Sequence, residues 1–119
     1  MIREEDLKGR TRRYALGMIR LYAGLPKTVE AQVIGKQFIR SGTSVGAQYR
    51  EACRAKSDAD FISKIEGCLQ ELEETAYWLE LTNDARLIFS DLVKAQLDET
   101  HELIAIFVTI AKKVKSRKA

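Results

Sequence analysis

Apolar residues recur at helical spacing in four long stretches of the chain, and short polar segments separate these stretches. The first stretch covers about residues 6–23, where apolar side chains three or four positions apart would share one face of a helix. The segment 24–26, Gly-Leu-Pro, ends it, since glycine suits the residue after a helix and proline cannot continue one. The second helix is expected from the N-cap Thr28 to about residue 55.

A polar turn at residues 56–58 separates the second helix from the third. Ser57 and Asp60 approximate a capping box, and the third helix should end at residues 83–84. The fourth helix should begin after Ser90. Short connections make consecutive helices antiparallel, so the pattern predicts an all-α chain, an up-down four-helix bundle forming one domain over residues 1–119.

The middle of the second helix is unusual, because residues 41–47 read Ser-Gly-Thr-Ser-Val-Gly-Ala. These residues favour helix weakly, so one interpretation is a loop that splits the helix. The other is a helix packed so closely that only small side chains fit, and tertiary packing would then maintain it. We favour the packed helix.

Residues 103–110 are apolar almost all round a helix. Such a segment is usually covered on more than one side. One side would face the bundle and the other a second subunit, so the pattern predicts a homo-oligomer.

The chain has 119 residues, 45% of them hydrophobic, and a formal net charge of +3. Basic residues concentrate in the first helix, at the end of the second and at the C-terminus, whereas residues 66–80 are acidic. A basic patch is the usual footprint of a polyanion partner. The expected nucleic-acid contacts are Arg12, Arg13, Arg50, Arg54, Lys112, Lys113 and Lys115. Tyr49 and Tyr77 would add stacking surfaces.

No catalytic or metal constellation is evident. Asp98 and His101 have the spacing of one di-iron motif, but such a site needs that motif on two helices and the chain has a single histidine. Glu71 and Glu74 lack the partners that acid-base chemistry requires, and one of them is expected to pair with Arg40 inside the bundle. No enzymatic activity, cofactor or metal is therefore predicted.

Cys53 and Cys68 lack a CxxC partner or a histidine cluster, which is typical of packed thiols in a reducing compartment. The first thirteen residues have no apolar core of the kind a signal peptide needs. The longest apolar run is too short to span a bilayer. We therefore expect a cytoplasmic protein with no membrane partner.

From residue 39 to residue 75 the chain resembles the bundle proteins encoded in intervening sequences of bacterial 23S ribosomal RNA genes. That family typically reads I-R-x-A-x-S-I-P-S-N-I-A-E-G, then a Ser and Glu-Phe stretch, then G-S-L-x-E-L-E-T. The matching positions are Ile39, Arg40, Ser44, Val45, Glu51, Ser57, Asp60, Phe61, Gly67, Leu69, Glu71, Leu72 and Glu73. The departures are Gly46 for the family proline, Gln48 for asparagine, Ala52 for glycine and Cys68 for serine.

The resemblance implies a ring-like homopentamer of four-helix bundles without established enzymatic activity, in which Arg40, Glu51 and Glu71 are structural. Related bundles serve diversity-generating retroelements by binding a reverse transcriptase and nucleic acid. Two hypotheses follow. The first is an oligomer that binds RNA or another nucleic acid through basic surfaces, and the second is a scaffold or accessory subunit for a protein such as a reverse transcriptase.

Overall fold

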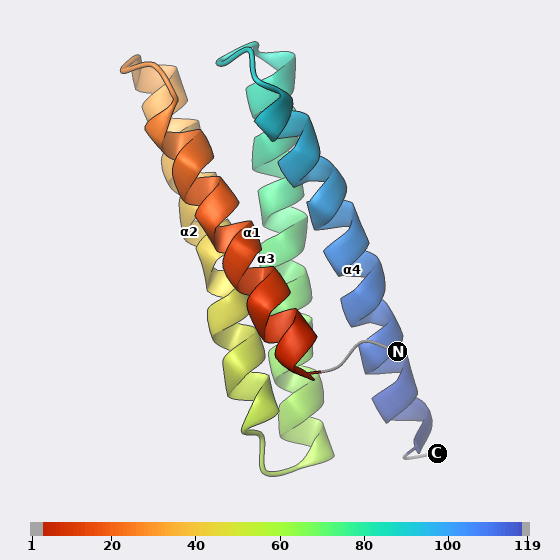
Figure 1. Cartoon of the computed structure of the whole chain (residues 1–119). Coiled ribbons are helices and arrows are strands. Elements are labelled where there is room, and N and C mark those ends of the chain that lie inside the picture. Colours follow the sequence, from red (N-terminus) through yellow and green to blue (C-terminus); the bar gives the residue numbers. More distant parts are fainter. Residues whose placement is uncertain (1–3, 118–119) are drawn as a thin grey trace.

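Four helices make up the part of the chain that the computed structural model describes, residues 4–117 (Figure 1). They are α1 (Glu4–Ala23), α2 (Val29–Cys53), α3 (Asp58–Asp84) and α4 (Asp91–Arg117). No strand occurs in this range, and the molecule measures 49 × 22 × 22 Å. The prediction of an all-α four-helix chain is confirmed.

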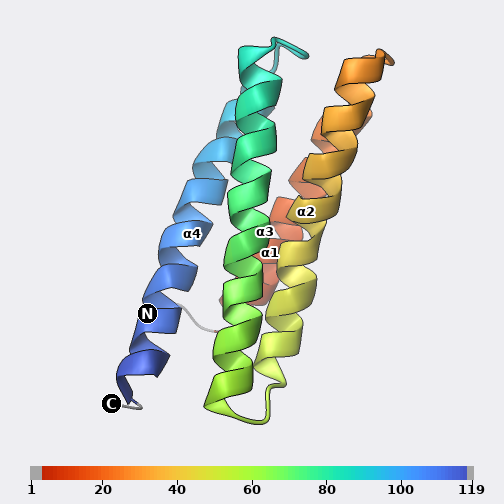
Figure 2. The same cartoon turned by 180° about the vertical axis from the view of Figure 1, so that it is seen from behind.

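Each helix packs against its neighbours in the sequence, and α1 also contacts α4. Within residues 4–117 the diagonal pairs, α1 with α3 and α2 with α4, make no close backbone contact. The connections 24–28 and 85–90 lie at one end of the molecule, whereas the turn 54–57 and the end of α4 lie at the other (Figures 1 and 2). Because α1 and α3 are diagonal in the bundle, their outer surfaces face away from each other.

The helix starts follow the predicted caps. The Thr28 side chain accepts a hydrogen bond from the Ala31 amide at 3.3 Å, and Ser57 accepts one from Asp60 at 3.0 Å. The Ser90 hydroxyl accepts one from the amide of Leu92 at 3.1 Å. These bonds satisfy amides that the first turn of a helix leaves without partners.

Helix α2 runs without interruption through residues 41–47, so the packed-helix interpretation is confirmed. Small residues are needed because α1 lies very close. A Cβ atom built on Gly42 would stand 2.5 Å from Met18 Cγ, and one on Gly46 would stand 3.0 Å from Thr11 Oγ1. Two of the residues that weaken the helix are therefore the ones that let α1 and α2 approach.

Buried hydroxyl groups join α1 to α4 and α2 to α3 at the centre of the bundle. The Tyr14 hydroxyl lies 2.5 Å from Thr100 Oγ1, and Ser41 Oγ lies 2.7 Å from Thr75 Oγ1. Gln96 also donates to the Tyr14 carbonyl oxygen at 3.1 Å. Burial raises the pKa of Tyr14 well above its ordinary value, so the phenol stays protonated. These bonds fix the register of α1 against α4 and of α2 against α3.

The apolar segment of α4 is covered on one side. Leu103 and Phe107 are fully buried, whereas Ile104, Ile106 and Ile110 remain half-buried. Apolar area therefore remains at the surface along this part of α4, as the oligomer prediction requires.

Candidate nucleic-acid interface

The outer surface formed by α1 and α2 carries three of the predicted cations. Arg12, Arg50 and Arg54 are exposed, and none forms an ion pair with another residue of the described range 4–117. Arg12 follows Thr11, which packs against α2 at Gly46, so Arg12 lies on the α2 side of α1. Arg50 and Arg54 continue this surface down the last turn of α2. Three unpaired guanidinium groups therefore share one side of the bundle.

Arg13 lies at the opposite edge of α1, because consecutive helical residues are about 100° apart. It stands one turn from Arg10, whose guanidinium reaches α4 and contacts Glu99 at 2.7 and 2.8 Å. The Arg13 side chain lies back over Gly9. Arg12 and Arg13 are adjacent in sequence but lie on two different surfaces of the bundle.

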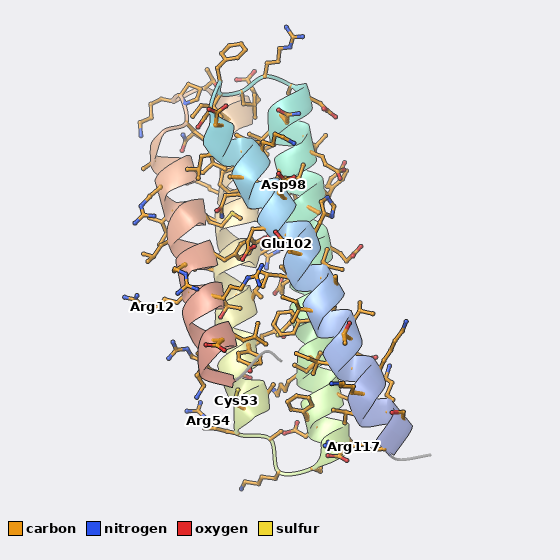
Figure 3. All side chains as sticks on the ribbon, turned by 45° about the vertical axis from the view of Figure 1, so that its right-hand side comes forward. Arg12, Cys53, Arg54, Asp98, Glu102 and Arg117 are labelled. Atoms are coloured by element: carbon orange, nitrogen blue, oxygen red, sulfur yellow. The ribbon has the colours of Figure 1, made fainter. Side chains whose placement is uncertain are left out.

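The predicted cations of α4 form a separate group. Lys112 and Lys113 are exposed and unpaired among the described residues, whereas Lys115 contacts Glu66 of α3 at 2.8 Å. Arg12 and Arg54 lie along one side of the bundle in Figure 3, and Arg117 marks the end of α4 away from them. The seven predicted residues are therefore divided between the α1–α2 surface, the far edge of α1 and the end of α4. The structure brings together three of them, not seven.

Helix α3 has the opposite charge. It contains eight carboxylates and one cation, Lys64. Since α3 lies diagonally across the bundle from α1, its outer face and that of α1 carry opposite charge on opposite sides. A polyanion that approaches the molecule is attracted to one side and repelled from the other.

The two predicted stacking residues differ in exposure. Tyr49 is only 4% exposed and packs in the core against Phe107 at a ring-centroid distance of 5.6 Å, so its predicted role as a stacking surface is wrong. Tyr77 is 54% exposed and packs edge-on against Trp78 at 5.0 Å. Tyr49 occupies one of the apolar positions that recur at helical spacing in α2, so the sequence pattern indicated that it is buried.

The residues assigned a structural role form a polar seam between α2 and α3. Arg40 contacts Glu74 at 3.0 Å and Glu71 at 3.5 Å. Lys64 contacts Glu51 at 3.0 Å, and this carboxylate raises the pKa of Lys64. Arg40 does pair with both carboxylates, but at the surface: its side chain is 51% exposed, so the expectation of a pair inside the bundle is corrected. A pair this exposed contributes little to stability.

The structure does not bring together the other residues that were considered for metal binding or catalysis. His101 is exposed on α4, and Asp98 contacts Lys94 at 3.7 Å. Among residues 6–117, whose side chains the structure describes, no group of three or more histidine, cysteine or acidic side chains is arranged to hold a metal ion. No helix in that range is long and apolar enough to cross a membrane.

Both thiols are reduced and packed. Cys68 is fully buried, and its thiol donates to the Val45 carbonyl oxygen at 3.5 Å, while Cys53 is half-buried. Burial raises the pKa of Cys68 to about 12. A buried thiol with a raised pKa is a poor nucleophile.

Comparison with known proteins identifies the family. A family model described as 23S rRNA-intervening sequence protein matches residues 4–109. A crystal structure from Bacteroides thetaiotaomicron, described as a protein with unknown function from the S23 ribosomal protein family, is 34% identical. The alignment covers 93% of this chain and 99% of that one, with a TM-score of 0.85. No curated protein matches. The chain belongs to the family of 23S rRNA-intervening sequence proteins.

Proposed function

We propose that this protein is a non-enzymatic, oligomeric four-helix bundle that binds RNA or another nucleic acid through its basic surfaces. The observation that carries the proposal is the group of unpaired guanidinium groups at Arg12, Arg50 and Arg54 on the α1–α2 surface. An arginine already paired with a carboxylate would have to break that pair to reach a phosphate. These three have no such pair within residues 4–117.

The expected contacts are with the phosphate backbone. Planar guanidinium groups bind phosphate oxygens in a bidentate geometry, and such contacts position a nucleic acid without reading its sequence. The α1–α2 surface offers no exposed aromatic platform in place of the buried Tyr49. We therefore propose binding with weak sequence preference, with Lys112 and Lys113 as a second, smaller group of contacts.

The acidic helix α3 would orient the complex. Four of its eight carboxylates are paired with cations of α2 and α4, and those that stay unpaired, such as Glu73 and Glu80, would repel a polyanion from its outer face and favour the side where α1 and α2 lie. A monomer with three principal phosphate contacts binds weakly at physiological salt. Repetition of the α1–α2 surface around an oligomer would multiply those contacts.

Oligomer formation is part of the proposal. Ile19, Val29 and Val33 are exposed by 47%, 79% and 56%, and the half-buried isoleucines of α4 add further apolar area. Apolar surface of this kind is typical of a protein that associates. We propose up-down bundles arranged in a ring, with five subunits as the expected number, in the cytoplasm.

The test is binding of a labelled structured RNA across a salt series, with the molar mass recorded in the same buffers. Binding through the α1–α2 surface predicts a steep fall in affinity with rising salt, and a shallower slope for R12A/R50A/R54A. The comparison variant is K112A/K113A, which removes the second, smaller group of cations and should lower the affinity and the slope less. Absence of RNA binding at low salt by an intact oligomer would overturn the proposal.

A protein-scaffold function remains as the second candidate. Phe89, in the connection between α3 and α4, is 87% exposed and borders an open hollow with Ile88 and Arg86. An exposed aromatic side chain beside an arginine is a common anchor in protein interfaces. The small-residue face of α2 is buried against α1 and is not available to a partner. F89A should weaken partner capture, for example of a reverse transcriptase, but leave RNA binding unchanged.

A further inference from the structure

The far edge of α1 carries a regular cationic stripe that the nucleic-acid proposal does not use. Arg13 and Arg20 are exposed, and neither has an ion-pair partner in the described part of the chain. They are seven residues apart, which places them about 10.5 Å apart along one side of the helix. Leu16 lies between them, half-buried, and Ile19 beside it is 47% exposed. The α1 stripe (Arg13, Leu16, Arg20) is thus apolar at its centre and positive at both ends.

The outer face of α3 carries a stripe with the same spacing and the opposite charge. Glu73 and Glu80 are exposed, seven residues apart, and without an ion pair or hydrogen bond in residues 4–117. Tyr77 lies between them, 54% exposed and held edge-on against Trp78. The α3 stripe (Glu73, Tyr77, Glu80) is therefore aromatic at its centre and negative at both ends.

Several other carboxylates of α3 are already neutralised within the chain. Glu66 contacts Lys115, Asp58 contacts Arg117 at 3.6 Å, and Glu71 and Glu74 share Arg40. These pairs use cations of α4 and α2. Glu73 and Glu80, which flank the exposed tyrosine, have no such cation.

The two stripes cannot meet in one molecule, since α1 and α3 are diagonal in the bundle and face opposite ways (Figures 1 and 2). We propose that the α1 stripe of one copy docks on the α3 stripe of a second copy. Each arginine then meets a glutamate, and Leu16 covers the Tyr77 ring. Because two different surfaces meet, the contact is head-to-tail and builds a ring or a chain of subunits.

This interface rests on the homo-oligomer in the proposed function and names one of its contacts, separate from the apolar area of α4. Arg50 and Arg54 lie on α2 and at its C-cap, outside this contact, whereas Arg12 lies one turn before Leu16 on the α2 side of α1 and borders the contact. The adjacent residues Arg12 and Arg13 thus have different roles in the proposal: Arg12 faces the nucleic acid, and Arg13 faces the next subunit.

Charge reversal tests the contact. R13E/R20E makes both stripes acidic, and E73R/E80R makes both basic. At low salt, each variant alone should self-associate about 100-fold more weakly than the original chain, since like charges then face each other. In an equimolar mixture each stripe meets its complement on the other variant, so light scattering should show that the two variants associate well above the monomer mass. The original mass is not required, because a ring of five subunits cannot alternate two variants throughout.

The control is K112E/K113E, which also reverses two exposed cations but should leave the mass unchanged. Circular dichroism confirms that each variant is folded. A monomeric original chain, unchanged assembly of either variant, or a folded mixture that stays dissociated would overturn this contact. RNA binding by the R12A/R50A/R54A variant is measured separately, so failure of the interface and failure of nucleic-acid binding give different results.

Discussion

Gly42→Ala adds one methyl group at the closest approach of α1 and α2. The new Cβ would stand 2.5 Å from Met18 Cγ and 3.1 Å from its sulfur, and Met18 is fully buried. The side chain of Met18 has no free volume into which to retreat without displacing the core. The substitution therefore sets a gain in helix propensity against a steric cost.

The two terms have different sizes. Alanine in place of glycine inside a helix contributes about 1 kcal/mol. Forcing an extra carbon into a packed core costs about 1 to 3 kcal/mol. The steric term is larger, so we expect Gly42→Ala to lower the free energy of unfolding by about 1 kcal/mol.

Gly9→Ala is the matched control on α1. Its Cβ would meet only the end of the Arg13 side chain at 3.3 Å, which can move. We expect this variant to be about 1 kcal/mol more stable, from helix propensity alone. For a chain of this size, the two variants should differ in Tm by roughly 8 °C in thermal melts followed by circular dichroism. Equal stabilisation by both substitutions would refute the close α1–α2 contact.

Three further outcomes follow from the core and its edge. Tyr14→Phe removes the hydroxyl that joins α1 to Thr100 and should lower the free energy of unfolding by about 1 kcal/mol in urea titrations; no change would mean that the hydroxyl network is not formed. The raised pKa of Cys68, about 12, means that the folded state holds this proton more tightly than the unfolded state. Stability should therefore be unaffected below pH 9 and should fall by up to about 1.4 kcal/mol per pH unit above it, a decline that Cys68→Ala reduces in melts between pH 8 and 11. Gly17→Ala should destabilise the α1–α4 contact and lower the Tm, because its Cβ would overlap the Gln96 amide group that donates to the Tyr14 carbonyl oxygen. An unchanged Tm would contradict this geometry.

Helix positions follow from the sequence because local signals agree there. Thr28, Ser57 and Ser90 each cap the helix predicted to follow. The segment 41–47 is a helix despite its weak propensity, since the approach of α1 decides its conformation. Periodicity places the buried face of each helix but does not say which neighbour covers it.

The candidate interface was less predictable. The basic residues are evident in the sequence, but their division depends on how the helices pack. Arg12 and Arg13 separate because α2 lies on one side of α1 and α4 on the other, and Lys115 is engaged because α3 brings Glu66 to it. Such contacts join residues far apart in the chain, so local sequence patterns do not reveal them. Tyr49 could have been assigned correctly, since it follows the apolar stripe of α2.

The central claim is that unpaired arginines on the α1–α2 surface bind nucleic-acid phosphates. The most direct measurement is the slope of log affinity against log salt for a structured RNA, comparing the original chain with R12A/R50A/R54A and K112A/K113A. We predict that the arginine variant loses most of the affinity and shows a shallower slope, while the lysine variant loses less. RNA binding that stays equally tight and equally salt-dependent in the arginine variant would contradict the account.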